Sequence, residues 1–285
     1  MKIFVLGSNG MLGRYVSTYL SKENTVVNLT RNELDAEHVT EDDITTTLIQ
    51  KGADSITFDS GDVIVNCIGM IKPQVDKLGP VAAIQVNSLF PRRLANVGEG
   101  LGAKVIHITT DCVWSGKDGN YCEDTSHDAL DVYGKTKSLG EPENCTVIRT
   151  SIIGEEVNNS RSLVEWIKSR KDLDANGFTN HKWNGVTCLE LAKCINDIIK
   201  NNNYWLGVRH VFSPTSVTKD VLLKLINDTY DLNITINNTE ATSPCDRTLS
   251  TKYPRDQIDR CCKILELEHQ IKEMKLYEGL CDDSN

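Results

Sequence analysis

The chain has 285 residues, of which 39% are hydrophobic and 25% charged, and this composition indicates a globular protein of one large or two modest domains. Its 40 acidic and 31 basic side chains give a net charge of −9, which argues against binding to nucleic acid or to an anionic membrane. No apolar run approaches the roughly 18 residues of a membrane helix. Because Met1 leads directly into an apolar strand, a secretory signal is not expected, and we expect a cytoplasmic protein.

The first half of the chain alternates strand and helix patterns. We expect strands at Lys2–Leu6, Thr25–Leu29, Asp62–Cys67, Val105–Thr110 and Cys145–Ile152, and helices at Met11–Ser21 and Pro80–Gly100. The strand at Asp62–Cys67 is almost entirely apolar, which is typical of a strand covered on both faces. This alternation predicts an α/β fold with a Rossmann-type, doubly wound parallel sheet.

The pattern loosens after about residue 152. We expect helices at Ser162–Arg170, Cys188–Lys200, Thr218–Tyr230 and Asp256–Lys275, a strand at Val208–Phe212, and frayed residues at 282–285. The sequence therefore predicts a dinucleotide-binding domain over residues 1–152, to which a later segment of about 185–215 returns. Residues 153–285 are expected to form mainly a smaller, mixed α/β substrate-binding lobe at the carboxyl edge of the sheet, where open α/β sheets bind ligands.

Ten cysteines are more than usual, but no C-x-x-C pair occurs among them. Most lie inside apolar runs, as Cys67, Cys145 and Cys194 do. We therefore expect reduced, buried thiols in a reducing compartment, and no metal site, with zinc binding or a disulfide framework as the alternative.

A glycine-rich turn follows the first strand and opens the first helix. It contains Gly7, Gly10 and Gly13. Gly7 permits the tight turn, Gly10 lets a pyrophosphate approach the backbone, and Gly13 lets the helix pack close to the sheet. The helix N-terminus adds free N–H groups and the positive end of its dipole. We expect the turn to bind a dinucleotide through Gly7, Asn9, Gly10, Met11, Leu12 and Gly13.

The second strand ends in Leu29-Thr30-Arg31. An acidic residue at this place would hydrogen-bond the ribose hydroxyls of NAD, whereas a basic residue pairs with the extra phosphate of NADP. Arg31 therefore favours NADPH as the cofactor. The alternative is a solvated surface arginine with NADH used equally well.

Tyr133 and Lys137 form a Y-x-x-x-K pattern, which on a helix places both side chains on one face. A phenol has a pKa of about 10 and is a poor acid–base group at neutral pH. A neighbouring ammonium and a positively charged nicotinamide ring would lower that pKa. The tyrosine can then protonate a carbonyl oxygen while hydride reaches the carbon. An exposed Tyr–Lys pair is the alternative interpretation.

Two strand ends add to this constellation. A buried strand ends in Thr109-Thr110-Asp111, and the Thr110 hydroxyl is placed to hydrogen-bond the same carbonyl. The alternative is that Thr110 caps its own turn. The preceding strand ends in Asn66-Cys67-Ile68-Gly69, where small residues let a cofactor lie on the backbone.

The G-x-x-G-x-x-G spacing and these patterns together resemble the dTDP-4-dehydrorhamnose reductase family of extended short-chain dehydrogenases. The resemblance runs from Lys2 to about Ser213, with further landmarks at residues 29–35, 63–66, 86–87, 110–116, 133–137, 140–141 and 147–150. It implies reduction of a 4-keto-6-deoxy sugar attached to a nucleoside diphosphate. It also implies that Thr110 orients the keto oxygen, Tyr133 donates the proton and Lys137 holds the nicotinamide ribose.

The chain departs from the family pattern at Cys112, where many members carry an aromatic residue. In related bifunctional epimerase–reductases a cysteine near this place acts as an acid–base group. Cys112 is therefore either such a group or a thiol lining an apolar pocket. Epimerisation also needs a second acid–base partner, for which Lys168, His181 and Lys182 are candidates.

A second departure is the segment 177–187, which stands where the family has a shorter substrate-facing loop. Trp183 can stack on the nucleobase or the sugar, or it can pack in the core, and Asn184 can hydrogen-bond sugar hydroxyls. Arg247 is placed to clamp the diphosphate, with an exposed arginine as the alternative. The resemblance further implies substrate contacts from Asn87, Val113 and Trp114.

Three functions are therefore carried forward. The first is an NADPH-dependent 4-keto reductase acting on a dTDP-4-dehydrorhamnose-like sugar or on UDP-2-acetamido-2,6-dideoxy-hexos-4-ulose, in the synthesis of deoxysugars for surface glycans. The second is a 3,5-epimerase/4-reductase that makes UDP- or dTDP-rhamnose with Cys112. The third is a non-catalytic NADP-binding partner that resembles the regulatory subunit of methionine adenosyltransferase. Because family members often dimerise, a homodimer is a further expectation.

Overall fold

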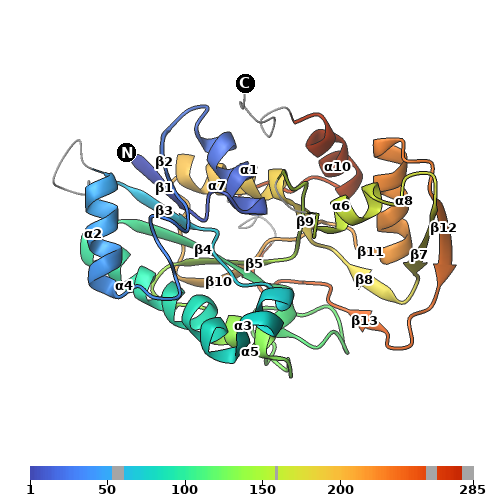
Figure 1. Cartoon of the computed structure of the whole chain (residues 1–285), viewed down its shortest axis with the longest axis horizontal. Coiled ribbons are helices and arrows are strands. Elements are labelled where there is room, and N and C mark those ends of the chain that lie inside the picture. Colours follow the sequence, from blue (N-terminus) through green and yellow to red (C-terminus); the bar gives the residue numbers. More distant parts are fainter. Residues whose placement is uncertain (53–60, 158–159, 255–261, 278–285) are drawn as a thin grey trace.

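A six-stranded parallel sheet forms the centre of the molecule (Figure 1). The computed structural model describes residues 1–52, 61–157, 160–254 and 262–277. In spatial order the strands are β10 (Gly207–His210), β5 (Thr146–Thr150), β4 (Lys104–Thr110), β3 (Val63–Asn66), β1 (Lys2–Leu6) and β2 (Thr25–Leu29). From β1 the chain passes to β2 on one side of it, and then to β3 on its other side. The strand order therefore reverses beside β1, which is the point where a doubly wound sheet opens a ligand crevice.

Helices cover both faces of this sheet because alternate side chains of each strand point to opposite sides. Ile3 and Val5 enter one core, which holds α1 (Met11–Leu20) and α7 (Cys188–Lys200). Phe4 and Leu6 enter the other core, with α2 (Glu41–Lys51) and α4 (Phe90–Leu101). Helices α3 (Lys72–Ile84) and α5 (Val132–Leu139) lie on this second side (Figure 1). All four side chains are fully buried, so both sheet faces contribute to the core.

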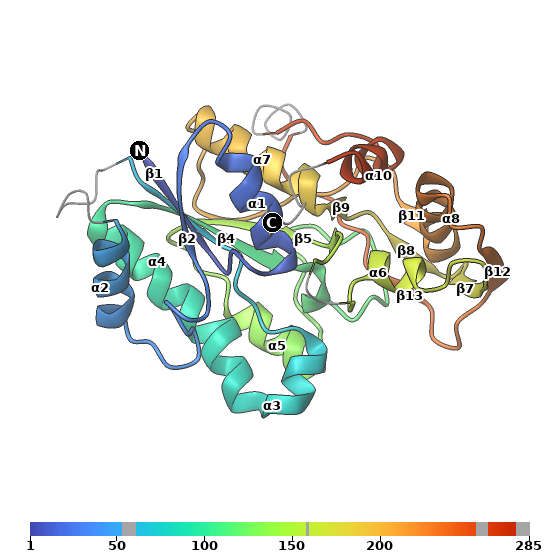
Figure 2. The same ribbon diagram turned by 45° about the horizontal axis from the view of Figure 1, so that its top comes forward.

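The second half of the chain builds a smaller lobe beside the sheet, on the right of Figure 2. Its β-structure comprises the pair β7 (Asp174–Phe178) and β12 (Thr235–Thr239), and a three-stranded sheet of β11 (Val217–Thr218), β8 (His181–Trp183) and β13 (Cys245–Asp246). The short strands β6 (Ile152–Ile153) and β9 (Val186–Thr187) pair with each other. The helices of this half are α6 (Leu163–Lys168), α8 (Lys219–Tyr230) and α10 (Leu267–Lys275).

The predicted fold class is confirmed, and individual elements differ from prediction. The helix expected at Pro80–Gly100 starts at Lys72 as α3, kinks where Gly79 has φ +85°, and continues through η1 (Gln85–Leu89) into α4. The helix expected from Asp256 is shorter, since residues 262–266 are not helical and α10 begins at Leu267. Residues 255–261 and 282–285 lie outside the described residues. The returning segment contains α7, which packs on α1, and β10, which pairs with β5.

The expectation of reduced thiols is wrong for one pair of cysteines. Cys194 of α7 and Cys262 form a disulfide, with Cα atoms 4.9 Å apart. They are 68 residues apart in sequence, and only the fold brings the segment before α10 against α7. Cys67 and Cys145 are free thiols, as expected. Every helix in the described residues is too short or too polar to span a lipid bilayer.

Candidate active site

The glycine turn connects β1 to the N-terminus of α1. Gly7 has φ +76°, and its N–H donates to the Leu29 carbonyl at 2.8 Å, which ties the turn to β2. A Cβ on Gly13 would stand 2.1 Å from the Gly7 carbonyl oxygen, so only glycine allows α1 to pack this close. No side chain caps α1 and no acidic residue stands in its first turn. Its first N–H groups are therefore available to an anionic ligand.

A cleft of about 480 Å³ lies at the carboxyl ends of the central strands. Of the residues expected to bind a dinucleotide, Gly10, Met11, Leu12, Cys67, Ile68 and Gly69 line it. Thr110, Cys112, Tyr133 and Lys137 line the same cleft. A Cβ on Gly69 would stand 3.4 Å from Lys137 Nζ, so Gly69 leaves open the space directly beside the ammonium. The cleft therefore joins the glycine turn to the side chains of Thr110, Tyr133 and Lys137.

Helix α5 presents Tyr133 and Lys137 to the cleft one turn apart. The Asp131 carboxylate caps the helix by accepting from Gly134 N at 2.8 Å, which fixes the start of α5 beside the end of β4. The Tyr133 phenol neighbours the Thr110 hydroxyl. That hydroxyl accepts from Cys112 N at 3.2 Å and donates to Asp111 Oδ1 at 3.1 Å, so Thr110 also caps the turn after β4. Lys137 Nζ donates to the Ile108 carbonyl at 3.4 Å. A hydroxyl, a phenol and an ammonium thus converge on one wall of the cleft.

Burial governs the protonation of these groups. Desolvation raises the pKa of Tyr133, and the hydrogen bond to Thr110 offsets only part of that rise. The sequence led us to expect a lowered phenol pKa beside Lys137. The structure shows the opposite direction, because burial and the neighbouring Cys112, Asp111 and Asp131 all disfavour the phenolate. Desolvation also lowers the pKa of Lys137 to about 8, against the opposing charge of Glu141. At neutral pH Tyr133 is therefore a phenol and Lys137 is mainly an ammonium.

Arg31 lies at the far end of the dinucleotide-binding region. It lines a cavity of about 210 Å³ with Gly7 and Gly10, and a further one of about 460 Å³ with Lys77 and Arg161. Its side chain is 67% exposed, and its guanidinium lies 3.4 Å from a carboxylate oxygen of Asp35 and of Glu37. Such exposed pairs are weak, so an incoming phosphate can replace them.

Three of the residues predicted to contact the cofactor or the substrate do not line the cleft. Asn9 is exposed and does not line the cleft or the two Arg31 cavities. Asn66 is buried, where its amide contacts His107 Nδ1 at 3.0 Å and accepts from Ile68 N at 3.0 Å. Asn87 is buried and exchanges two hydrogen bonds with the Met70 backbone, at 2.8 and 3.0 Å. Asn66 and Asn87 therefore hold the loop after β3 in shape and do not line the cleft.

Cys112 lines the cleft next to Thr110, and burial raises the pKa of its thiol to about 12. The candidates for its acid–base partner lie elsewhere, since neither Lys168, His181 nor Lys182 lines the cleft. Lys168 is paired with Glu155, and Lys182 lies 3.2 Å from Asp246. The structure therefore does not bring Cys112 together with any of the three.

Val113 and Trp114 are fully buried outside the cleft. The Trp114 indole stacks on Tyr121 with ring centroids 4.6 Å apart, and its Nε1 donates to the Ser126 carbonyl at 3.2 Å. Arg149 lies over its other side, 4.7 Å from the ring centroid. Trp114 is a core side chain and does not reach a ligand in the cleft.

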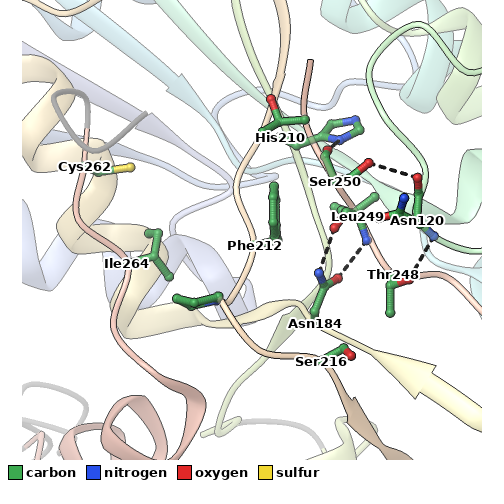
Figure 3. A pocket seen from close by; sticks show the side chains of 12 residues that line it. Asn120, Asn184, His210, Phe212, Ser216, Thr248, Leu249, Ser250, Cys262 and Ile264 are labelled. Carbon is green, nitrogen blue, oxygen red and sulfur yellow. Dashed lines mark hydrogen bonds between the residues drawn. The ribbon is translucent and has the colours of Figure 1, made fainter. Parts of the chain in front are cut away.

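Asn184 faces a second cavity of about 420 Å³, shown in Figure 3. Its amide exchanges hydrogen bonds of 2.8 Å with the backbone of Leu249, so it joins two chain segments.

Trp183 packs half-buried against the core shared with α1 and α7. Arg247 donates to the carbonyls of Trp114 and Ser115, at 3.0 and 3.2 Å. Its charge acts on Asp111 and Cys112 at the cleft, so of these three residues only Arg247 approaches it.

The cleft also has residues that the sequence patterns did not single out. Gln74, Ser151, Glu156, Arg161 and Ser162 complete its wall. They come from α3, from the segment after β5 and from the segment before α6. None of these residues belongs to a spaced motif. Their position in the chain after β3 or after β5 was therefore the only sequence feature that could have predicted a place at the cleft.

Comparisons with known proteins agree with this architecture. The profile of the family described as RmlD substrate binding domain matches residues 1–222. The chain is 28% identical to a dTDP-4-keto-6-deoxy-D-glucose reductase of Streptomyces niveus, over 80% of this chain and 77% of that relative. It is 29% identical to the methionine adenosyltransferase 2 subunit beta of Xenopus laevis, over 51% of this chain and 49% of that relative.

Among solved structures, the fold matches the dTDP-4-dehydrorhamnose reductase of Bacillus anthracis in complex with NADP. The TM-score is 0.78 at 19% identity, with 96% of this chain and 98% of that chain covered. An identity this low shows a shared fold. The family match extends over more than half of the chain, and its fold, glycine turn and cleft are all present. This chain therefore belongs to the RmlD substrate binding domain family.

Proposed function

We propose that the protein is an NADPH-dependent reductase of the 4-keto group of a nucleotide-linked 4-keto-6-deoxy sugar. The observation that carries the proposal is the convergence of Thr110, Tyr133 and Lys137 on a cleft that begins at the glycine turn. The residues present fit the cofactor: α1 offers uncapped N–H groups, Gly69 leaves room beside Lys137, and Arg31 lies beyond the turn. The names of the relatives support both the substrate class and the cofactor.

NADPH, when bound, supplies the hydride that the keto carbon accepts. The Tyr133 phenol donates its proton to the keto oxygen, so that the carbonyl becomes a hydroxyl. Thr110 holds that oxygen by a hydrogen bond from the end of β4. Lys137 holds the nicotinamide ribose and places its positive charge near the phenolate that Tyr133 becomes. The phenolate then recovers a proton from solvent.

The direct experiment is to incubate the protein and NADPH with a panel of dTDP- and UDP-linked 4-keto-6-deoxy sugars. The panel includes dTDP-4-dehydrorhamnose and UDP-2-acetamido-2,6-dideoxy-hexos-4-ulose. We expect NADPH absorbance to fall with at least one of them, and NMR of the product to show a new C4 hydroxyl. NADPH that persists with every sugar of the panel would contradict the proposal.

The two other functions receive less support. For epimerisation, a thiol with a pKa of about 12 stays protonated at neutral pH and is a poor base, and none of the three candidate partners, Lys168, His181 and Lys182, lines the cleft. A non-catalytic binding partner would need no proton donor, whereas Thr110, Tyr133 and Lys137 all line the cleft. The expected homodimer stays a prediction, which sizing by light scattering checks.

Arg31→Ala is expected to weaken NADPH binding by about 10- to 100-fold, the size of one or two hydrogen bonds to a charged group. NADH binding should change little, because NADH lacks the 2′-phosphate. Fluorescence titration with both cofactors measures this. Lys22→Ala removes an equal charge from an exposed lysine beside Tyr19 and serves as the control. Equal losses for NADPH and NADH in Arg31→Ala would show that Arg31 does not read the phosphate.

The affinity for NADPH is expected to fall above pH about 8, where Lys137 loses its charge. The pKa of Lys137 lies below its ordinary value in the free protein, and a bound anionic cofactor would raise it. The dissociation constant should therefore rise by up to about tenfold per pH unit above pH about 8. Lys137→Met should bind NADPH more weakly and lose this slope. A wild-type affinity that stays constant well above pH about 8, with circular dichroism unchanged, would contradict the assignment.

A further inference from the structure

The Cys194–Cys262 disulfide joins α7 to the segment that leads into α10. Cys194 lies inside α7, whereas Cys262 belongs to residues 262–266, which form neither helix nor strand. Both side chains are buried, with exposed fractions of 1% and 4%. A cross-link between remote segments favours their association, because it limits how far they can separate. The disulfide therefore fastens an irregular segment to a helix of the main core.

The cavity of Figure 3 gives access to one sulfur of this disulfide. Cys262 lines the cavity, whose volume is about 420 Å³, and Cys194 does not. In Figure 3, Cys262 and Ile264 stand on one side of the cavity, across from Asn184 and Leu249. Thiol–disulfide exchange requires that a thiolate reach the sulfur that it attacks. Cys262 is therefore the cysteine at which a small thiol can attack.

The segment after Cys262 holds the place where β9 joins α7. Leu265 N donates to Glu190 Oε1 of α7 at 2.7 Å. The Gln270 side chain accepts from Thr187 N at 2.9 Å and donates to the Leu265 carbonyl at 2.7 Å. Thr187 is the last residue of β9, and its hydroxyl caps α7 by accepting from Glu190 N at 3.2 Å. Leu265 and Gln270 therefore hold β9 and the start of α7 together.

The strand β9 in turn supports a wall of the candidate active-site cleft. It pairs with β6, where Thr187 lies opposite Ile153, and Val186 N donates to the Ser151 carbonyl at 2.9 Å. Ser151 and Ile152 line the cleft. A continuous set of contacts therefore connects the segment after the disulfide with the cleft.

We propose that the Cys194–Cys262 disulfide is a reversible redox switch that determines how firmly the cleft wall at Ser151 is held. With the bond intact, Leu265 and Gln270 are kept against α7 and β9. With the bond reduced, the segment is held only by hydrogen bonds and packing, so it opens more often and β9 loses its support during each opening. Among the cysteines in the described part of the chain only this pair is joined, so reduction there removes a single cross-link.

A dithiol opens the bond in two exchange steps. Its first thiolate attacks the Cys262 sulfur, the bond to Cys194 breaks, and the Cys194 sulfur leaves as a thiolate that takes up a proton. The second thiolate of the dithiol then attacks the sulfur of the first, and Cys262 leaves as a thiolate that takes up a proton. Two electrons and two protons thus pass from the dithiol to the cysteines, and the dithiol becomes a disulfide. Oxidised glutathione reverses the exchange by accepting two electrons and two protons, which convert it to two thiols.

The test is hydrogen–deuterium exchange, followed by mass spectrometry, on the full chain equilibrated with oxidised glutathione or with dithiothreitol. After reduction we expect the amides of residues 186–187 and 265–276 to exchange about tenfold faster or more. The amides of β1 should exchange equally in both states and serve as the internal reference. Alkylation with iodoacetamide and peptide mass spectrometry verify that Cys194 and Cys262 are joined in one sample and free in the other.

Cys262→Ser should exchange like the reduced wild type under both conditions. Cys261→Ser is the matched control, because it removes the neighbouring cysteine of the sequence, and it should respond like the wild type. The effect on turnover rests on the proposed function: reduction should raise the KM for the sugar by about fivefold or more and leave kcat nearly unchanged. A sugar panel without turnover would contradict that function alone, since the exchange measurement needs no substrate.

Five results would each overturn the proposal. The first is equal exchange of residues 186–187 in the two states, and the second is a pair of cysteines that stays free under oxidised glutathione. The third is a disulfide that dithiothreitol does not reduce in the folded protein. The fourth is a response that is lost in Cys261→Ser. The fifth is an active enzyme whose KM is the same in both states.

Discussion

Tyr133→Phe is expected to lower the turnover of a 4-keto sugar by at least about 100-fold, the usual contribution of a positioned general acid. The substitution removes one oxygen, the proposed proton donor, and keeps the buried ring. NADPH binding should stay close to wild type, because the proposed cofactor contacts at the glycine turn, Arg31 and Lys137 are unchanged. Turnover is followed as NADPH absorbance at saturating sugar, and binding as NADPH fluorescence.

The control for this variant is Tyr19→Phe, which removes a phenol from α1 outside the cleft. It should reduce the sugar at the wild-type rate. A Tyr133→Phe enzyme that also turned over at the wild-type rate would show that another group supplies the proton. A higher KM with unchanged kcat would limit Tyr133 to substrate binding.

Arg149→Met is expected to lower the free energy of unfolding by about 3–5 kcal/mol, because it leaves a buried carboxylate without its partner. The Arg149 side chain is almost fully buried, and it contacts Glu141 through two bonds of 3.0 and 2.6 Å. It also contacts His210 Nε2 and His127 Nε2, each at 2.9 Å. Urea unfolding followed by circular dichroism measures the loss.

This cluster lies close to the active site, since the charge of Glu141 acts on Lys137. Arg170→Met is the control: its exposed guanidinium lies 5.8 Å from the Trp166 ring centroid, and its loss should cost below about 1 kcal/mol. The double variant Glu141→Met/Arg149→Met should regain part of the stability, because no unpaired charge remains. If Arg149→Met and Arg170→Met were equally stable, the buried ion pair would contribute nothing measurable.

Local sequence patterns predicted most of the strands and helices in the first half of the chain. The almost entirely apolar run at Asp62–Cys67 predicted a strand buried on both faces, and all four residues of β3 within it are buried. Gly13 predicted the close packing of α1. Tyr133 and Lys137 lie on one helix face because four residues make one turn. The helix α2 was missed, although Thr40 and Asp43 form a capping box at its start. Its short apolar pattern, with only Ile44 and Leu48 buried, gave a weak periodic signal.

The roles of polar and aromatic side chains followed from partners remote in sequence. Asn184 looked available for a sugar hydroxyl, yet it pairs with the backbone of Leu249, 65 residues away. Trp114 was expected to contact the substrate, yet it is fully buried, with Tyr121 stacked on its indole and Arg149 over its ring. Both residue types suit a ligand or a core equally well, so their chemistry alone could not decide between these two places.

The sequence by itself determined features that depend on residues close together in the chain. These are the alternation of strands and helices, the spacing of the glycines, and the tyrosine one helical turn from its lysine. Only the tertiary structure decided which side chains face the cleft and which cysteines pair. The physical reason is range. Backbone geometry repeats every two to four residues and can be read locally, whereas burial and charge pairing depend on neighbours that the folded chain brings from tens of residues away.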